Sequence, residues 1–154
     1  MQDGLAALKI LFRVQIIAGF LILFILYKID PGIGRIDVPW LMVVLGAGVV
    51  GIAGAHWSTR RPLALESNES LASSYRTAFF SGFGLSEMPL MLAFVACFIT
   101  KDLWPYLSEL PLWLIGMSLI APTNSNLAKR QQEIAAQGSI LDLAEALRAQ
   151  NAKA

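Results

Sequence analysis

The stretch AFFSGFGLSEMPLMLAFVACFIT, from Ala78 to Thr100, decides the fold class of this chain. It is long enough to cross a bilayer, because a helix needs about 20 apolar residues to span a hydrocarbon core about 30 Å thick. The carboxyl group of Glu87 lies near its middle. Insertion scales put an acidic residue at a helix centre at roughly 2.5 to 3.5 kcal/mol, so such residues usually face a partner, a bundle interior or an ion path. The stretch therefore predicts a membrane helix, and its carboxyl group is expected to have a structural or a functional role.

The composition of the whole chain also indicates a membrane protein. Of its 154 residues, 56% are hydrophobic and 15% are charged, against about 45–50% and about 25% in soluble domains. The net charge of +1 provides no basic patch that could follow a phosphate backbone, so we expect no nucleic-acid partner. The length allows one domain, and a chain that is mostly transmembrane leaves little room for a separate catalytic domain.

Four apolar segments follow one another along the chain, and each approaches the length of a membrane span. They cover residues of about 5–27, 38–57, 78–100 and 104–122. The expected fold class is an all-α membrane protein, with four transmembrane helices in an up-down-up-down bundle over residues 1–123. The fourth segment is the weakest, because Ser108, Glu109 and Pro111 lie in its first half. We expect Glu109 to reach the membrane interface, or else to line an outer vestibule leading toward Glu87.

Basic residues are distributed unequally between the two sides of this predicted bundle. One side would hold nine of them and the other side three. The nine are Lys9, Arg13, Arg60, Arg61, Arg76, Lys129, Arg130, Arg148 and Lys153, and the three are Lys28, Arg35 and Lys101. By the positive-inside rule, both the N-terminus and the C-terminus are expected in the cytoplasm. The low charge and the short loops favour a bacterial inner membrane. Because the predicted helices span a membrane, the lipid bilayer is the first expected partner.

A polar loop and a tail lie outside the predicted spans. Ser67 or Asn68 can cap a helix that begins near Glu69 and continues into the third span. The tail, residues 124–154, is expected to form two short cytoplasmic helices that are broken at Gly138.

The second helix of the tail has an apolar face. This face consists of Ile140, Leu143, Ala144 and Leu147. An amphipathic helix buries such a face against another surface. Here the surface is either the membrane or the bundle of this chain, or it belongs to a docking partner.

Small residues line the second predicted span. Ala47, Gly51 and Ala55 are four residues apart, and Gly48 and Gly54 lie on neighbouring rows. Such a face lets another helix approach closely, because packing rather than hydrophobicity drives helix association in lipid. The neighbouring helix belongs either to this chain, or to another membrane subunit, or to a second copy.

The second and third spans, with the loop between them, resemble the helical hairpin of the rotor subunit c of ATP synthases over residues 45–100. The likeness lies in the glycine-rich helix, the loop motif Arg60-Arg61-Pro62 and the apolar run around Glu87. In that family the loop carries Arg-Gln-Pro, and the outer helix carries a carboxylate that binds and releases a proton. The resemblance implies that Glu87 is this carboxylate and that Gly84 is the small residue one turn before it.

The chain departs from that family in three ways. Arg61 replaces the glutamine of the loop motif, the stretch between Pro62 and Arg76 is longer, and two more predicted spans flank the hairpin. Additional helices would crowd the outer wall of a ring, where a rotor carboxylate meets the stator. The resemblance therefore implies a shared local architecture rather than a working rotor ring.

Two roles are open for Glu87. It can lock helices together through Ser86, Ser81 or a backbone carbonyl freed by Pro89, which has no N–H to donate. Alternatively, it can bind and release a proton or a cation beside Gly84 and Ser86, because hydrocarbon disfavours the charged form of a carboxyl group.

These two roles lead to two functions. A helix lock favours a non-catalytic accessory or assembly subunit of a larger membrane complex, which docks through the small-residue face of the second span. A carrier favours proton or cation translocation. We expect no enzyme activity, because the single histidine, His56, ends a span far from any set of nucleophile, base and orienting acid. With that one histidine and one cysteine, Cys97, we expect no metal site and no cofactor.

Overall fold

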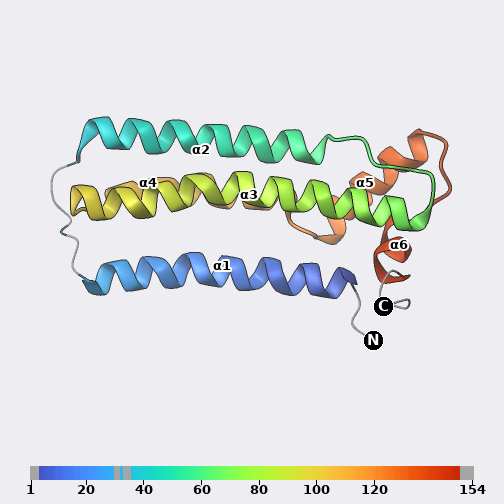
Figure 1. The fold of residues 1–154 in the computed structure, drawn as a ribbon, viewed down its shortest axis with the longest axis horizontal. Coiled ribbons are helices and arrows are strands. Elements are labelled where there is room, and N and C mark those ends of the chain that lie inside the picture. The colour runs from blue at the N-terminus through green and yellow to red at the C-terminus, as the bar shows by residue number, and fades with distance from the viewer. Residues whose placement is uncertain (1–3, 30–31, 33–35, 150–154) are drawn as a thin grey trace.

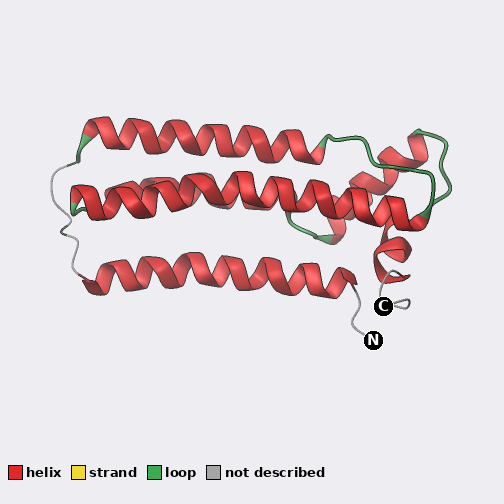
Figure 2. Cartoon of the chain, in the orientation of Figure 1, coloured by secondary structure: helices red, strands yellow, loops and turns green. Residues whose placement is uncertain are grey.

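The structure of the protein is a computed structural model that describes residues 4–29, 32 and 36–149. These residues form six helices and no β-strand. The helices are α1 (Gly4–Ile29), α2 (Val38–Thr59), α3 (Asn68–Thr100), α4 (Trp104–Ile120), α5 (Asn124–Ala136) and α6 (Leu143–Ala149). The helices α1 to α4 run along one common axis, and α5 and α6 gather at one end (Figures 1 and 2). The predicted all-α fold is confirmed.

The first four helices coincide with the four apolar segments of the sequence. The helices α1, α2 and α3 are each long and apolar enough to cross a membrane, judged by length and composition. The helix α4 has 17 residues and is therefore about 26 Å long at 1.5 Å per residue. At the end of the bundle away from α5 and α6, Gly32 and Asp102 form an isolated backbone bridge between the two loops.

The helix α3 is the longest element, and local chemistry explains both of its ends. Ser67 caps the start, because its side chain accepts a hydrogen bond from the backbone N–H of Ser70, and the Ser70 hydroxyl accepts one from Ser67 in return. Lys101 ends the helix in the left-handed conformation, with φ of 54°. The predicted start of this helix is confirmed. Its 33 residues reach about 50 Å, well beyond a hydrocarbon core of about 30 Å.

The helices α2, α3 and α4 pack directly against one another and form the centre of the bundle. Their shared core includes Val44, Leu90, Trp113 and Met117, all of which are fully buried. The helix α1 lies beside this group and exposes most of its large apolar side chains. In a bilayer, such exposed apolar side chains meet lipid rather than water.

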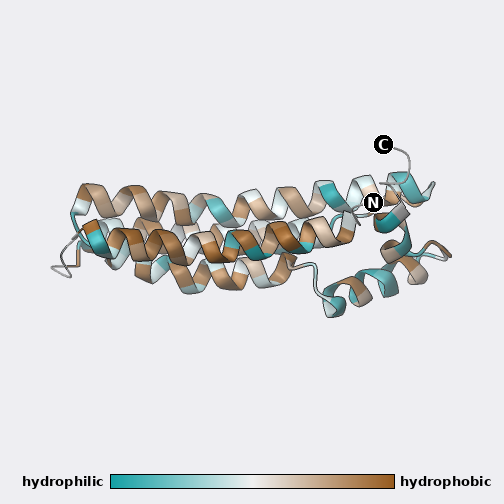
Figure 3. Cartoon of the chain, turned by 90° about the horizontal axis from the view of Figure 1, so that it is seen from below, coloured by the Kyte–Doolittle hydropathy of each residue, from teal (hydrophilic) through white to brown (hydrophobic). Residues whose placement is uncertain are grey.

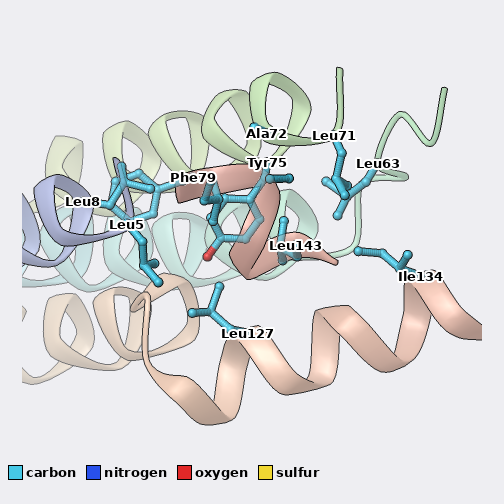
Figure 4. Packing of buried hydrophobic residues seen from close by; sticks show 12 residues of the cluster. Leu5, Leu8, Leu63, Leu71, Ala72, Tyr75, Phe79, Leu127, Ile134 and Leu143 are labelled. Carbon is cyan, nitrogen blue, oxygen red and sulfur yellow. The ribbon is translucent and has the colours of Figure 1, made fainter. Parts of the chain in front are cut away.

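The two tail helices fold back onto the start of α3 and of α1, as the close view in Figure 4 shows. Leu143 of α6 and Leu127 of α5 enter one apolar cluster with Leu71 and Tyr75. The surface that covers the tail is therefore the bundle of this chain. The prediction that Ile140 belongs to the apolar face is wrong, because its side chain is 100% exposed. Asp142 caps α6 by accepting from Glu145 N–H, so Ile140 lies before the helix begins.

The attachment of the tail can be tested with a matched pair of variants. Leu143→Ala removes a buried side chain from the cluster and should destabilise the docked tail by about 2–5 kcal/mol, since it leaves a cavity. Ile140→Ala removes a fully exposed side chain and should change nothing. Hydrogen exchange of the amides in α5 and α6 measures the difference. Equal protection in the two variants would contradict this packing.

Candidate functional site

Glu87 of α3 is held by side chains from two other helices. Its Oε1 accepts a hydrogen bond of 2.9 Å from the indole Nε1 of Trp113 in α4. The side chain of Gln15 in α1 also interacts with the same carboxyl group. Glu87 itself is only partly buried. The carboxyl group thus joins α1, α3 and α4 through polar contacts inside the apolar part of the bundle.

Two aromatic side chains of α4 position α1 against this carboxyl group. Trp113 is 1% exposed and lies so close to Gly19 of α1 that a Cβ atom there would be 2.6 Å from its ring. The hydroxyl of Tyr106 donates a hydrogen bond of 2.8 Å to the backbone carbonyl oxygen of Gly19. Sequence reasoning missed Gly19, Trp113 and Gln15. Gly19 was a detectable signal, because it is a single small residue within a run of large apolar ones.

Glu109 of α4 is a second carboxyl group within the bundle, and it is fully buried. Neither of its oxygens has a hydrogen-bond partner among the described residues. It lies against Gly48 of α2, where a Cβ atom would be 2.7 Å from Oε1. The prediction that Glu109 reaches the membrane interface is wrong. The absence of a side chain at Gly48 lets α2 and α4 approach until they enclose the carboxyl group.

The structure does not bring the predicted ion-binding residues together around Glu87. Ser86 is buried and faces Gly116 of α4, and its hydroxyl also lacks a hydrogen-bond partner within the described part of the chain. Gly84 is exposed, and nothing lies within 4 Å of where its Cβ would be. The carboxyl group that lies against the glycine-lined face of α2 is that of Glu109.

The small-residue face of α2 is covered by other helices of the same chain. A Cβ atom on Gly51 would lie 2.8 Å from Cγ of Pro89 and 3.0 Å from the backbone oxygen of Leu85. One on Gly54 would lie 2.9 Å from Cδ1 of Leu85. Ala55 is fully buried, and Ala47 is partly buried. This face therefore positions α3 and α4 inside the bundle.

The loop motif after α2 contacts the first tail helix. The guanidinium group of Arg61 lies over the ring of Trp57, 3.9 Å from its centroid. The backbone oxygen of Arg61 accepts a hydrogen bond of 2.9 Å from Nη2 of Arg130 in α5. Arg60 and Pro62 are exposed at the same end of the bundle. The motif thus connects the bundle to its tail. It lies near the start of α3, whereas Glu87 lies near the middle of that helix.

Metal-binding groups do not gather in the described residues. No cluster of three or more His, Cys, Asp or Glu residues there could hold a metal ion. Cys97 is buried as a free thiol in the core between α3 and α4. The chemistry of the bundle interior therefore depends on the two carboxyl groups, Glu87 and Glu109.

Comparisons with known proteins give this chain no relative. No protein-family model, no curated protein and no solved structure matches it.

Close packing at Gly51 can be tested against a control glycine on the same helix. Gly51→Ala places a methyl group against the backbone of Leu85 and the ring of Pro89, which should destabilise the bundle by about 1–3 kcal/mol. Gly46→Ala has nothing within 4 Å and should be neutral or stabilising by up to about 1 kcal/mol through helix propensity. Thermal unfolding in mild detergent compares the two. A Gly51→Ala variant as stable as Gly46→Ala would refute the contact.

Proposed function

We propose that this chain is a non-catalytic integral membrane protein that serves as an accessory or assembly subunit of a larger membrane complex. The observation that supports this proposal most is the environment of Glu87. A carboxyl group that accepts a hydrogen bond from Trp113 of α4 and interacts with Gln15 of α1 acts as a lock between helices. Inside a bilayer a polar group has to find its partner within the protein. A carboxyl group with such partners therefore keeps the helices in a fixed arrangement, as a scaffold requires.

In this proposal α4 is the fourth span, and the bundle has an up-down-up-down topology. With Leu103 and Ala121 added at its two ends, the length of α4 approaches the thickness of the hydrocarbon core. The end that carries α5 and α6 is cytoplasmic, and so are both termini. The basic residues of that end support this orientation, among them Lys9, Arg60 and Lys129. Of the basic residues used for the orientation, Arg35 and Lys153 lie outside the described residues. We place the protein in a bacterial inner membrane.

The docking surface for a partner lies away from the small-residue face of α2. That face is already covered by α3 and α4, so a partner meets an outward face of the bundle. The outward side of α1 exposes large apolar side chains, including Ile17, Phe20 and Phe24. A helix of another subunit or of a second copy can replace lipid there without exposing a polar group.

Substitutions at Glu87 test the lock. Glu87→Gln keeps an oxygen that can accept from Trp113 Nε1, so the folded bundle and its co-purifying partners should persist. Glu87→Leu leaves the Trp113 N–H without an acceptor, and an unsatisfied buried donor costs about 1–3 kcal/mol. We expect a lower unfolding temperature for Glu87→Leu alone, and the same co-purifying chains for wild type and Glu87→Gln after native purification in mild detergent.

Two results would contradict this first proposal. One is a wild-type protein that purifies alone, without another subunit or a second copy. The other is loss of a measured transport activity in Glu87→Gln with an unchanged unfolding temperature, because a pure lock does not need a titratable group.

A second candidate function is proton or cation translocation, and the burial of Glu109 favours it. A buried carboxyl group without a donor marks an ion or proton path in many membrane proteins. Glu109 stands one helical turn before Trp113, the residue that binds Glu87. One carboxyl group therefore belongs to α4, and the other is hydrogen-bonded to that helix. The resemblance to rotor subunit c implies that Glu87 is the carrier. The partners of Glu87 from α1 and α4 would make this a carrier within one bundle rather than on the outer wall of a ring.

Reaction with a hydrophobic carbodiimide tests the carrier. The reagent attacks a protonated carboxyl group, so modification of Glu87 should decrease as pH rises. Glu109→Gln should shift this pH profile if the two groups exchange a proton. Glu69, an exposed acid at the start of α3, provides the internal control, and mass spectrometry locates the modified residue. If Glu87 stays unreactive at every pH, the carrier function fails.

A further inference from the structure

A cavity of about 360 Å³ lies where α2 and α4 end and α5 begins. Four helices contribute to its wall. The last turn of α2 supplies Ser58 and Thr59, and Arg60 follows directly after it; α5 supplies Lys129 and Arg130. The hydrophobic helices of the bundle meet the hydrophilic tail at this end of the molecule, as Figure 3 shows. The cavity thus lies at the boundary between apolar and polar parts of the fold.

The charge of the cavity is positive. It is lined by three cationic side chains and one carboxylate, that of Glu133. Arg130 is occupied, because its Nη1 is 2.7 Å from Glu133 Oε2 and its Nη2 donates to the carbonyl oxygen of Arg61. The exposed side chains of Arg60 and Lys129 have neither a hydrogen bond nor an ion pair with any residue that the structure describes. Two positive charges therefore remain without a partner.

The serine, threonine and asparagine side chains of the cavity are already engaged, whereas the side chains of His56 and Tyr75 line it without a hydrogen bond to a described residue. The hydroxyl of Ser58 donates to the backbone oxygen of Ala55 at 2.7 Å, and the hydroxyl of Thr59 donates to the backbone oxygen of His56 at 2.7 Å. The amide of Asn126 donates to backbone carbonyls at the end of α4. The charged donors left for a ligand are those of Arg60 and Lys129, which select an anion.

Part of the remaining wall is apolar. This part is formed by Ala78 and Phe79 of α3 and by Leu119 and Ile120 of α4. Leu119 and Ile120 form the end of α4, whereas Ala78 and Phe79 lie within the long helix α3. A ligand that fits the whole cavity therefore has a negatively charged group and an apolar part next to it.

We propose that this cavity binds the phosphate headgroup of an anionic phospholipid, with Arg60 and Lys129 contacting the phosphate and the apolar wall contacting the glycerol and acyl region. Basic pockets between helices at the cytoplasmic surface recognise anionic headgroups by this chemistry. The inference rests on the proposed function in one respect, since it requires that the chain spans a bilayer with this end at the cytoplasmic surface.

The test uses the full chain, purified in mild detergent and analysed by native mass spectrometry with added phosphatidylglycerol or phosphatidylcholine. Wild type should bind phosphatidylglycerol roughly tenfold more tightly than phosphatidylcholine, because each basic residue at the surface adds attraction for an anionic lipid. The double variant Arg60→Gln/Lys129→Gln should lose this preference. The matched control, Arg13→Gln/Arg76→Gln, removes the same charge on the same side outside the cavity and should keep the preference.

Three results would overturn the inference. These are equal binding of both lipids by wild type, a preference that survives in Arg60→Gln/Lys129→Gln, and an equal loss in the control variant, which would indicate unspecific attraction. Millimolar inorganic phosphate forms a separate arm. If it displaces the lipid and stabilises the protein in detergent alone, the ligand is a soluble phosphate and the lipid assignment fails. Membrane insertion is measured independently by resistance to alkaline extraction, so failure of the spanning topology is distinguished from failure of this site.

Discussion

The hydrogen bond from Trp113 to Glu87 is the interaction on which the rest of the bundle depends. A carboxyl group inside an apolar bundle is tolerated when the protein supplies its partners, since lipid offers none. Trp113 from α4 and Gln15 from α1 supply them. To reach the carboxyl group, the indole has to pass over α1 at a position without a side chain, and Gly19 provides this position. One polar contact thus determines the rotation and the depth of three helices at once.

The opposite side of α4 is organised by the absence of side chains. Gly48, Gly51 and Gly54 allow α2 to touch α3 and α4 closely, so the small-residue face is used for internal packing. The same close approach encloses Glu109 without a hydrogen-bond donor. The bundle thus provides one carboxyl group with a hydrogen bond and encloses the other without one. The first environment favours the proposed scaffold, and the second favours the proposed carrier.

The end of the bundle that carries α5 and α6 has a separate organisation. The tail covers the projecting turns of α3 through an apolar cluster, and Arg130 ties α5 to the loop after α2. The cavity beside this attachment is lined by the cations Arg60 and Lys129 and by apolar side chains of α3 and α4. The loop motif therefore has a structural explanation that does not involve Glu87.

The all-α class, the approximate positions of α1 to α4 and a cap of α3 at Ser67 or Asn68 could be predicted from the sequence, because length, apolar runs and capping chemistry are local properties of the chain. The sequence also pointed to Glu87, since a carboxyl group in an apolar run is visible without a structure. Only the tertiary structure decided which neighbours Glu87 meets and that Glu109 is buried. The physical reason is that these helices are apolar on all sides, so no amphipathic pattern specifies their rotation about their own axes. That rotation follows from close contacts at Gly19, Gly48 and Gly51, and contacts between distant parts of the chain exist only once the bundle has formed.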